Sequence, residues 1–250
     1  MSLNIREELY SNMQNEGEAR LEFTRKAYHL LPDLGKPRIL DIGCGQGVPT
    51  LELARLSCGE IIGLDTNQDD LDLLSRKIVK AGLSEQVQVV NGSMFDLNFP
   101  DESFDVIWSE GSINIIGFER GLMEWRRLIK PAGFLVVHEM TWLRPNPPQE
   151  IVDRWQSVYP GIRTTAEYTS QIPHFGYVLI DHFQLPEDTW WRDYYGPLET
   201  RIAELRNKYS MDQQAQELLE KEQREVDLFK RHARWYGSAF FLMQRVFKSG

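Results

Sequence analysis

The chain has 250 residues, 28 Lys and Arg against 37 Asp and Glu, and a formal net charge of −9. This acidic balance argues against a broad nucleic-acid footprint, because binding to phosphates requires a basic face. Two cysteines give neither a disulfide framework nor a metal cluster, and no apolar run is long enough for a membrane span or a signal peptide. We therefore expect one large α/β domain in a reducing, cytoplasmic setting, with no metal and no membrane partner.

Residues 4–31 show a helical apolar face that is interrupted near Gly17. The sequence predicts an N-terminal helical cap within residues 1–35, and Gly17 is a candidate hinge. A surface helix with solvated charges is the alternative. Four side chains of this segment are candidates to reach a ligand: Tyr10, Arg20, Thr24 and Arg25.

Residues 38–47 read RILDIGCGQG, which is a short aliphatic run, a carboxylate and three closely spaced glycines. The order of a strand, a glycine-rich turn and a helix predicts a nucleotide-binding turn at the carboxyl edge of a parallel sheet. The glycines are spaced G-x-G-x-G, whereas the dinucleotide fingerprint G-x-G-x-x-G would need glycine where Val48 stands. The preceding Asp41 favours a ligand with an ammonium group over one with phosphates.

Further strand patterns follow at residues 60–65, 87–90, 103–111 and 134–139, with a helix expected at residues 117–130. Asp65 ends the second strand, where a carboxylate can accept hydrogen bonds from both hydroxyls of a ribose. Capping of the next helix by residues 66–69 is the alternative, and both roles can coexist. Strands that alternate with helices indicate a parallel sheet with right-handed crossovers.

With these motifs the chain resembles the class I S-adenosylmethionine-dependent methyltransferases, through residues 40–47 and the run LIKPAGFLVV at residues 128–137. The resemblance implies a Rossmann-like, doubly wound, mostly parallel seven-stranded sheet with an antiparallel last strand. It also implies S-adenosyl-L-methionine as cofactor and S-adenosyl-L-homocysteine as product. The cofactor contacts that it suggests are Asp41, Gly43, Cys44, Gly45, Gly47, Asp65, Thr66, Ser93, Met94 and Ser109. Ser93 departs from the family, whose members often carry an acidic residue there.

Glu110 follows the fourth strand and is the candidate catalytic residue. The sulfonium already provides a leaving group, so a base is needed only when the acceptor loses a proton. Binding of the methionine ammonium by Glu110 is an equal alternative. His138 ends the fifth strand, where a packed structural histidine is favoured over a base.

The chain changes character after residue 140, where aromatic residues accumulate. We expect an acceptor-side insertion at residues 141–235, with a helix at 149–159, a strand at 176–184 and two helices within 197–234. The sequence SMDQ at residues 210–213 indicates a capping box that opens the second of these two helices. A final strand is expected within residues 236–250, after the cofactor-binding core at residues 36–140. The candidate acceptor-pocket residues are Tyr10, Trp142, Trp191, Tyr194 and Tyr195, although rings of this kind also form cores.

The sequence thus predicts a single methyltransferase domain that acts on a small acceptor of apolar or cationic character, as a monomer or homodimer. The segments WSEG and IGFERG, at residues 108–111 and 116–121, are similar to uncharacterised small-molecule-type members of the family. Three alternatives stay open: a non-catalytic S-adenosylmethionine-binding protein, a protein or RNA methyltransferase, and an NAD oxidoreductase that Val48 disfavours.

Overall fold

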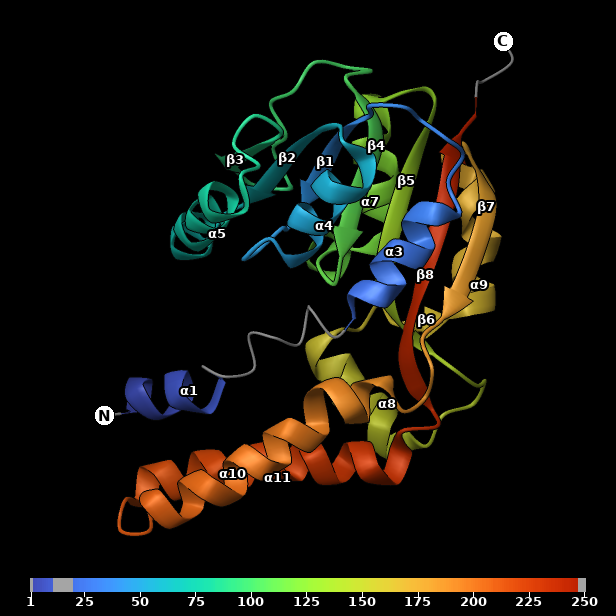
Figure 1. Ribbon diagram of the computed structural model, residues 1–250. Helices are drawn as coiled ribbons and strands as arrows, with labels where there is room; N and C mark the ends of the chain where they lie inside the picture. The colour runs from blue at the N-terminus through green and yellow to red at the C-terminus, as the bar shows by residue number, and fades with distance from the viewer. Residues whose placement is uncertain (1, 11–19, 247–250) are drawn as a thin grey trace.

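The computed structural model describes residues 2–10 and 20–246, and its centre is one twisted sheet (Figure 1). The strand order is β3-β2-β1-β4-β5-β8-β7, with β6 paired to β5. Strands β1 to β5 pair in parallel, whereas β8 is antiparallel to both β5 and β7. The strands are β1 (Arg38–Ile42), β2 (Glu60–Asp65), β3 (Val87–Asn91), β4 (Phe104–Glu110), β5 (Ile129–Trp142), β6 (Arg163–Thr164), β7 (Tyr177–Gln184) and β8 (Tyr236–Arg245). The expected seven-stranded path is confirmed, and the two-residue β6 adds an eighth strand.

Helices cover both faces of the sheet, as expected for a doubly wound fold (Figure 1). Helices α3 (Leu21–His29), α4 (Val48–Ser57) and α5 (Gln68–Ala81) lie on one face. The other face is covered by α6 (Ile113–Ile116), α7 (Phe118–Trp125), the 3-10 turn η2 (Arg126–Leu128), α9 (Thr165–Gln171) and η3 (Ile172–Phe175). Side chains alternate along each strand, so Ile39 and Leu40 of β1 belong to the two different cores.

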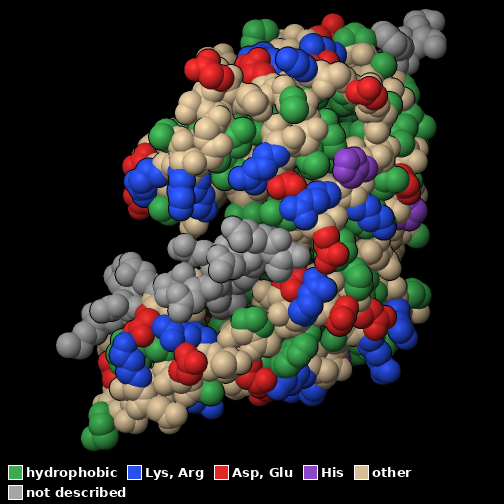
Figure 2. Space-filling model, in the orientation of Figure 1, with side chains coloured by type: hydrophobic (Ala, Val, Ile, Leu, Met, Phe, Trp, Pro, Cys, Tyr) green, Lys and Arg blue, Asp and Glu red, His purple; other side chains and the backbone are tan. Residues whose placement is uncertain are grey.

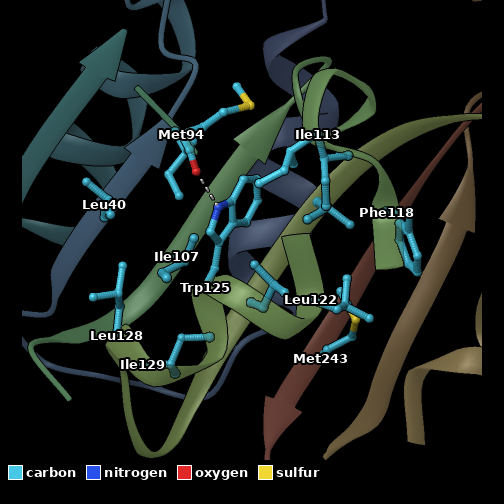
Figure 3. Packing of buried hydrophobic residues seen from close by; sticks show 14 of the residues in the cluster. Leu40, Met94, Ile107, Ile113, Phe118, Leu122, Trp125, Leu128, Ile129 and Met243 are labelled. Atoms are coloured by element: carbon cyan, nitrogen blue, oxygen red, sulfur yellow. Dashed lines mark hydrogen bonds between the residues drawn. The ribbon is translucent and has the colours of Figure 1, made fainter. Parts of the chain in front are cut away.

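Trp125 connects α7 with the loop that follows β3. Its ring is fully buried beside Ile113 and Leu122, and its Nε1–H donates to the Met94 carbonyl at 3.3 Å (Figure 3). A buried indole normally satisfies its N–H in this way. The loop at the carboxyl end of β3 is therefore held against the core.

Two local expectations were wrong. The helix expected to reach residue 130 ends as α7 at Trp125, and β5 starts at Ile129, because Ile129 pairs with Phe104. The second correction concerns the expected capping box at residues 210–213. The N-cap of α11 is Asp212, whose side chain accepts a hydrogen bond from the Ala215 amide at 3.0 Å.

A layer of helices lies across the carboxyl edge of the parallel strands (Figure 1). It consists of α1 (Ser2–Tyr10), α8 (Gln149–Val158), the π-helical turn η4 (Trp191–Tyr195), α10 (Gly196–Lys208) and α11 (Gln213–His232). Its own core includes Tyr195, stacked on Phe229 at 4.0 Å between ring centroids. Within the described ranges, no helix combines the length and apolar character needed to cross a bilayer.

Candidate active site at the carboxyl edge of the sheet

Three glycines between β1 and α4 have positive φ, at +75° for Gly43, +48° for Gly45 and +75° for Gly47. A Cβ on Gly43 would lie 2.4 Å from Ser112, and one on Gly47 would lie 2.1 Å from Leu74, so tight packing requires both glycines. At Gly45, in contrast, no heavy atom lies within 4 Å of the added Cβ. The middle of the turn therefore leaves its backbone open to a ligand.

The Asp65 carboxylate lies beside this open glycine. Its Oδ2 accepts the Gly45 amide at 2.9 Å, and its Oδ1 accepts the Asn67 amide at 2.9 Å. The helix-capping role falls to Asn67, whose side chain accepts from the Asp69 amide at 3.1 Å. The exposed Thr66 follows directly. The structure thus brings the glycine turn and the acid that ends β2 into one site.

Two polar side chains around the turn point into the protein. Asp41 is 2% exposed and accepts a hydrogen bond from the Thr50 hydroxyl at 2.6 Å. Burial raises the pKa of Asp41 to about 7, although the hydrogen bond from Thr50 acts in the opposite direction. Cys44 is also buried, with its Sγ 3.1 Å from where a Cβ on Gly63 would stand. Cys44 can therefore meet a ligand mainly through its backbone.

The Ser109 side chain ties the end of β4 to the turn. Its hydroxyl lies 2.7 Å from that of Ser112, which in turn donates to the Ile42 carbonyl at 2.6 Å. The methyl group of Met94 also lies next to the turn, 3.7 Å from where a Cβ on Gly43 would stand. Ser93 is half-buried beside it and accepts the Phe95 amide at 3.2 Å.

Glu110 sits at the end of β4, beneath α3. Its Oε1 accepts from Trp108 Nε1 at 2.7 Å, and its Oε2 accepts from the Thr24 hydroxyl at 3.2 Å. Burial raises the pKa of Glu110 to about 7, and the negative charge of Asp41 adds to this effect. The two hydrogen bonds and the Arg20 charge lower it. Glu110 therefore changes charge close to neutral pH.

His138 is the register partner of Glu110 on β5, so the two side chains project from the same face of the sheet. Burial, aided by the positive charge of Arg20, lowers the pKa of His138 to about 3. The imidazole is therefore neutral at physiological pH, and its Nε2 makes no hydrogen bond to any described residue.

The four N-terminal candidates lie in three different places. Arg20 and Thr24 reach the carboxyl edge, where the Arg20 guanidinium lies 4.9 Å from the Trp190 ring centroid. Arg25 instead pairs with Glu52 of α4 at 2.6 Å. Tyr10 belongs to the helical layer. The proposed hinge at Gly17 lies outside the described residues.

Three of the five candidate acceptor residues line a cavity, and the two tryptophans pack within the helical layer. Tyr10, Tyr194 and Tyr195 line one cavity of about 880 Å³ between α1, α8 and α11, whose lining includes no residue of the range 36–140. Trp142 packs in the aromatic core of the helical layer, and Trp191 has the Lys230 ammonium 5.0 Å from its ring centroid. The cavity is therefore separate from the glycine turn.

Seven described residues have a buried polar side-chain atom without a hydrogen bond, and five of them come from the N-terminus of α3, from β5, from β8 and from the segment before η4. Elsewhere in the described residues, only Gln86 and Gln171 have such an atom. Buried polar atoms rarely lack partners, so each of these atoms is a point at which a ligand or a water molecule could supply the missing bond. The other five are Arg20 Nη1, His138 Nε2, Glu139 Oε2, Thr189 Oγ1 and the Tyr236 hydroxyl. The sequence analysis did not select Glu139 or Thr189 as site residues. For Glu139, the presence of an acid within an apolar strand could have indicated a special role.

A family model described as a methyltransferase domain matches residues 40–137, which run from within β1 to within β5. The chain carries a class I methyltransferase domain. Over 178 residues it is 30% identical to the sterol 24-C-methyltransferase of Neurospora crassa, and the match covers 68% of this chain and 47% of that protein. The chain thus spans about half the length of the curated relatives that it matches.

Two solved structures have the same fold as the methyltransferase domain and its helical layer. An S-adenosylmethionine-dependent methyltransferase from Geobacter sulfurreducens, in complex with S-adenosyl-L-homocysteine, has a TM-score of 0.75 and 20% identity, covering 96% of this chain and 97% of that one. The [4+2]-cyclase SpnF also has a TM-score of 0.75 and 20% identity, with coverages of 97% and 94%. Because one of these proteins is a cyclase, the shared fold does not by itself determine the reaction.

Proposed function

We propose that this protein transfers the methyl group of S-adenosyl-L-methionine to a small-molecule acceptor. The observation that carries the proposal is the 2.9 Å hydrogen bond between the Gly45 amide and Asp65, which places a carboxylate next to an open backbone. Asp65 would accept hydrogen bonds from the ribose hydroxyls of the cofactor. Thr66 would lie beside the ribose, and Ser93 and Met94 would line the adenine.

The remaining residues of the turn would shape the site. Gly43 and Gly47 allow the close packing against Ser112 and Leu74 that the turn requires. The backbone of Cys44 would approach the cofactor, and the buried Asp41 and Ser109 would hold the turn in place through Thr50 and Ser112. Residues 36–140 would thus bind the cofactor, while residues 141–235 would close over the acceptor.

When bound, the sulfonium supplies an activated methyl group and its own leaving group. The chain's residues then have to align the acceptor in line with the methyl and keep water away. Glu110 is suited to two tasks here, since a carboxyl that titrates near pH 7 can take a proton from the acceptor or hold the methionine ammonium. Its location between α3 and β4 supports either role.

A small molecule is the acceptor that the enclosure of the site favours. The helical layer lies across the carboxyl edge of the sheet (Figure 1). The unpartnered polar atoms of His138, Glu139 and Thr189 are buried. Acidic and basic side chains are interleaved on the face seen in Figure 2, which supports a protein that does not bind nucleic acid. We further propose that it acts in the cytoplasm as a monomer or homodimer.

Incubation with methyl-labelled S-adenosylmethionine and a metabolite extract tests this proposal. Label is expected in a small-molecule fraction. Label found instead in protein or RNA would refute the small-molecule acceptor. If the protein binds S-adenosylhomocysteine but transfers no label to any fraction, it is a non-catalytic protein that binds the cofactor.

The Glu110→Gln variant separates the two roles of Glu110. If Glu110 accepts the proton, kcat falls by about 10²- to 10⁴-fold while the affinity for S-adenosylhomocysteine stays the same. If it holds the ammonium, that affinity falls. A variant that matched the parent in both measurements would leave Glu110 without either role.

A further inference from the structure

Arg20 is a positively charged residue that the proposed function does not use. It directly precedes α3, and its Nη1 atom is buried without a hydrogen bond to any described residue. A guanidinium carries five N–H donors and no acceptor, and a buried donor without a partner costs free energy. Arg20 therefore lacks a partner that an anionic ligand could supply.

Trp190 sets the position of this guanidinium. The Arg20 Cζ atom lies 4.9 Å from the centroid of the indole ring, and Trp190 Nε1 donates to the Ser238 hydroxyl at 3.1 Å. Ser238 of β8 is the register partner of Met140 on β5. Met140 follows His138 by two residues, so both side chains project from the same face of the sheet. The guanidinium therefore lies near the end of β5, on the face that carries His138.

Helix α3 brings Arg20 close to Glu110 as well. The Arg20 carbonyl accepts the Phe23 amide at 2.9 Å, so the helical path already begins at Arg20. Thr24 is four residues further on the same side of the helix, and its hydroxyl donates to Glu110 Oε2 at 3.2 Å. Glu110 is in turn the register partner of His138. Burial dominates the pKa of both Glu110 and His138, and the charge of Arg20 lowers both values, as expected for a nearby guanidinium.

Glu110 also lies next to the glycine turn. Asp41 of β1 is the register partner of Trp108 on β4. Gly43 and Glu110 each follow this pair by two residues, which places them at the same level of the carboxyl edge. Ser112 completes the contact, because its side chain lies 2.4 Å from where a Cβ on Gly43 would stand. A ligand on the open face of the turn can therefore extend past Glu110 to the guanidinium.

We infer that Arg20 binds the carboxylate of the methionine moiety of S-adenosyl-L-methionine; this inference rests on the proposed function. The moiety carries an ammonium and a carboxylate on one carbon, so it needs a negative and a positive protein group close together. Glu110 and Arg20 are such a pair. Both oxygens of Glu110 accept hydrogen bonds from Trp108 and Thr24, and no ion pair joins Glu110 to Arg20.

The type of side chain fits this task. A guanidinium can donate two parallel N–H bonds to one carboxylate while its flat face stacks on an aromatic ring. The Trp190 ring supplies that stacking surface. In this arrangement the ammonium of the ligand points to Glu110, which is one of the two roles that the proposed function gives to this residue.

Calorimetry with two ligands tests the inference without any acceptor. The ligands are S-adenosylhomocysteine and its decarboxylated analogue, which keeps the amine and has a hydrogen in place of the carboxylate. The parent should bind S-adenosylhomocysteine about 10- to 100-fold more tightly than the analogue, because the charge-assisted bonds are lost. Arg20→Gln should bind both ligands with the affinity that the parent has for the analogue. That unchanged affinity for the analogue also shows that the variant is folded.

Two further variants serve as controls. Arg20→Lys keeps the charge without the planar fork and should lose only part of the preference for S-adenosylhomocysteine. Lys26→Gln should keep all of it, since the exposed Lys26 is another cation of α3 whose ammonium lies over a different ring, 4.0 Å from the Phe183 centroid.

The outcomes separate the inference from the proposed function. If Arg20→Gln keeps the parent's preference, or loses affinity for both ligands equally, Arg20 does not bind the carboxylate. If the parent binds neither ligand, the proposed function itself is refuted.

Hydrogen exchange of the parent provides an independent measurement. Because Arg20 adjoins α3, a bound carboxylate should hold the first turn of this helix in place. Saturating S-adenosylhomocysteine should therefore slow exchange of the α3 amides several-fold more than the saturating analogue does. Equal protection by the two ligands would contradict a contact between the carboxylate and Arg20.

Discussion

The assignment of a cofactor site depends at the residue level on Asp65. Its two carboxylate oxygens accept the amides of Gly45 and Asn67, so its position is set by the backbone on both sides. A carboxylate held in this way needs little rearrangement to bind a pair of ribose hydroxyls. The contribution of Asp65 to the free energy of cofactor binding can be measured directly.

Asp65→Asn is expected to weaken the binding of S-adenosylhomocysteine by about 10- to 100-fold, because hydrogen bonds to a charged group contribute roughly 1.5–3 kcal/mol. Asp72→Asn is the control, since Asp72 accepts a hydrogen bond from Gln68 on the outer side of α5. Calorimetry measures both affinities. Equal affinity in the two variants would exclude Asp65 from the cofactor site.

Several residues of the site could be predicted from the sequence, and others could not. Gly45 and Asp65 were predictable, because a positive-φ turn and a strand-end acid have local signatures. The inward orientation of Cys44 and Ser109 depends on packing against other strands, which one segment does not encode. The approach of Arg20 to the carboxyl edge depends on long-range packing in the same way.

At the level of elements, α3 is the segment that covers the carboxyl edge. It is attached there by the hydrogen bond from Thr24 to Glu110, and by the ion pair between Glu22 and Arg192 at 3.1 Å. The buried bond contributes more than the exposed ion pair, because water competes with surface charges. A substitution of Thr24 is therefore expected to loosen the contact between α3 and the carboxyl edge more than a substitution of Glu22 or Arg192.

Thr24→Val keeps the shape of the side chain and removes the hydroxyl. We expect a loss of about 1–3 kcal/mol of local stability, since Glu110 loses a buried hydrogen-bond donor. Hydrogen exchange of the α3 amides should become faster, while Thr24→Ser, which keeps the hydroxyl, should remain close to the parent. Unchanged exchange in the valine variant would show that other contacts hold α3.

Element boundaries were predicted best where the chain itself carries a strong signal. The strands β1, β2 and β4 follow from short apolar runs that lie close to an acid or a glycine. The early start of β5 and the two-residue β6 depend on pairing with distant strands. For the same reason, the aromatic residues of the insertion could not be divided in advance between core and cavity.

At the level of the whole molecule, buried acids couple folding to pH. The pKa values of Asp41, Glu110 and Glu139 are all raised, to about 7, 7 and 8. Over this range the folded protein keeps protons that the unfolded chain has released. The free energy of unfolding should therefore be greatest in mild acid and fall as pH rises through these values.

Urea unfolding at pH 5.5 and at pH 8.5 measures how far the free energy of unfolding falls between these two pH values. Glu139 is 2% exposed and each unit of pKa shift corresponds to about 1.4 kcal/mol, so Glu139→Gln should reduce the fall by a few kcal/mol. The exposed Glu85→Gln control should leave it unchanged. A Glu139→Gln protein with the parent's pH dependence would show that Glu139 does not hold a proton in the folded state.

The central claim is that the open face of the glycine turn receives S-adenosylmethionine. Gly45 and Gly35 both have positive φ, at +48° and +64°, and at both a Cβ would meet no atom within 4 Å. Gly45→Ala and Gly35→Ala should therefore each lose about 1–2 kcal/mol of stability from backbone strain. Calorimetric titration with S-adenosylhomocysteine is predicted to show that the parent and Gly35→Ala bind while Gly45→Ala does not. Absence of binding by the parent, or equal binding by both variants, would contradict the account.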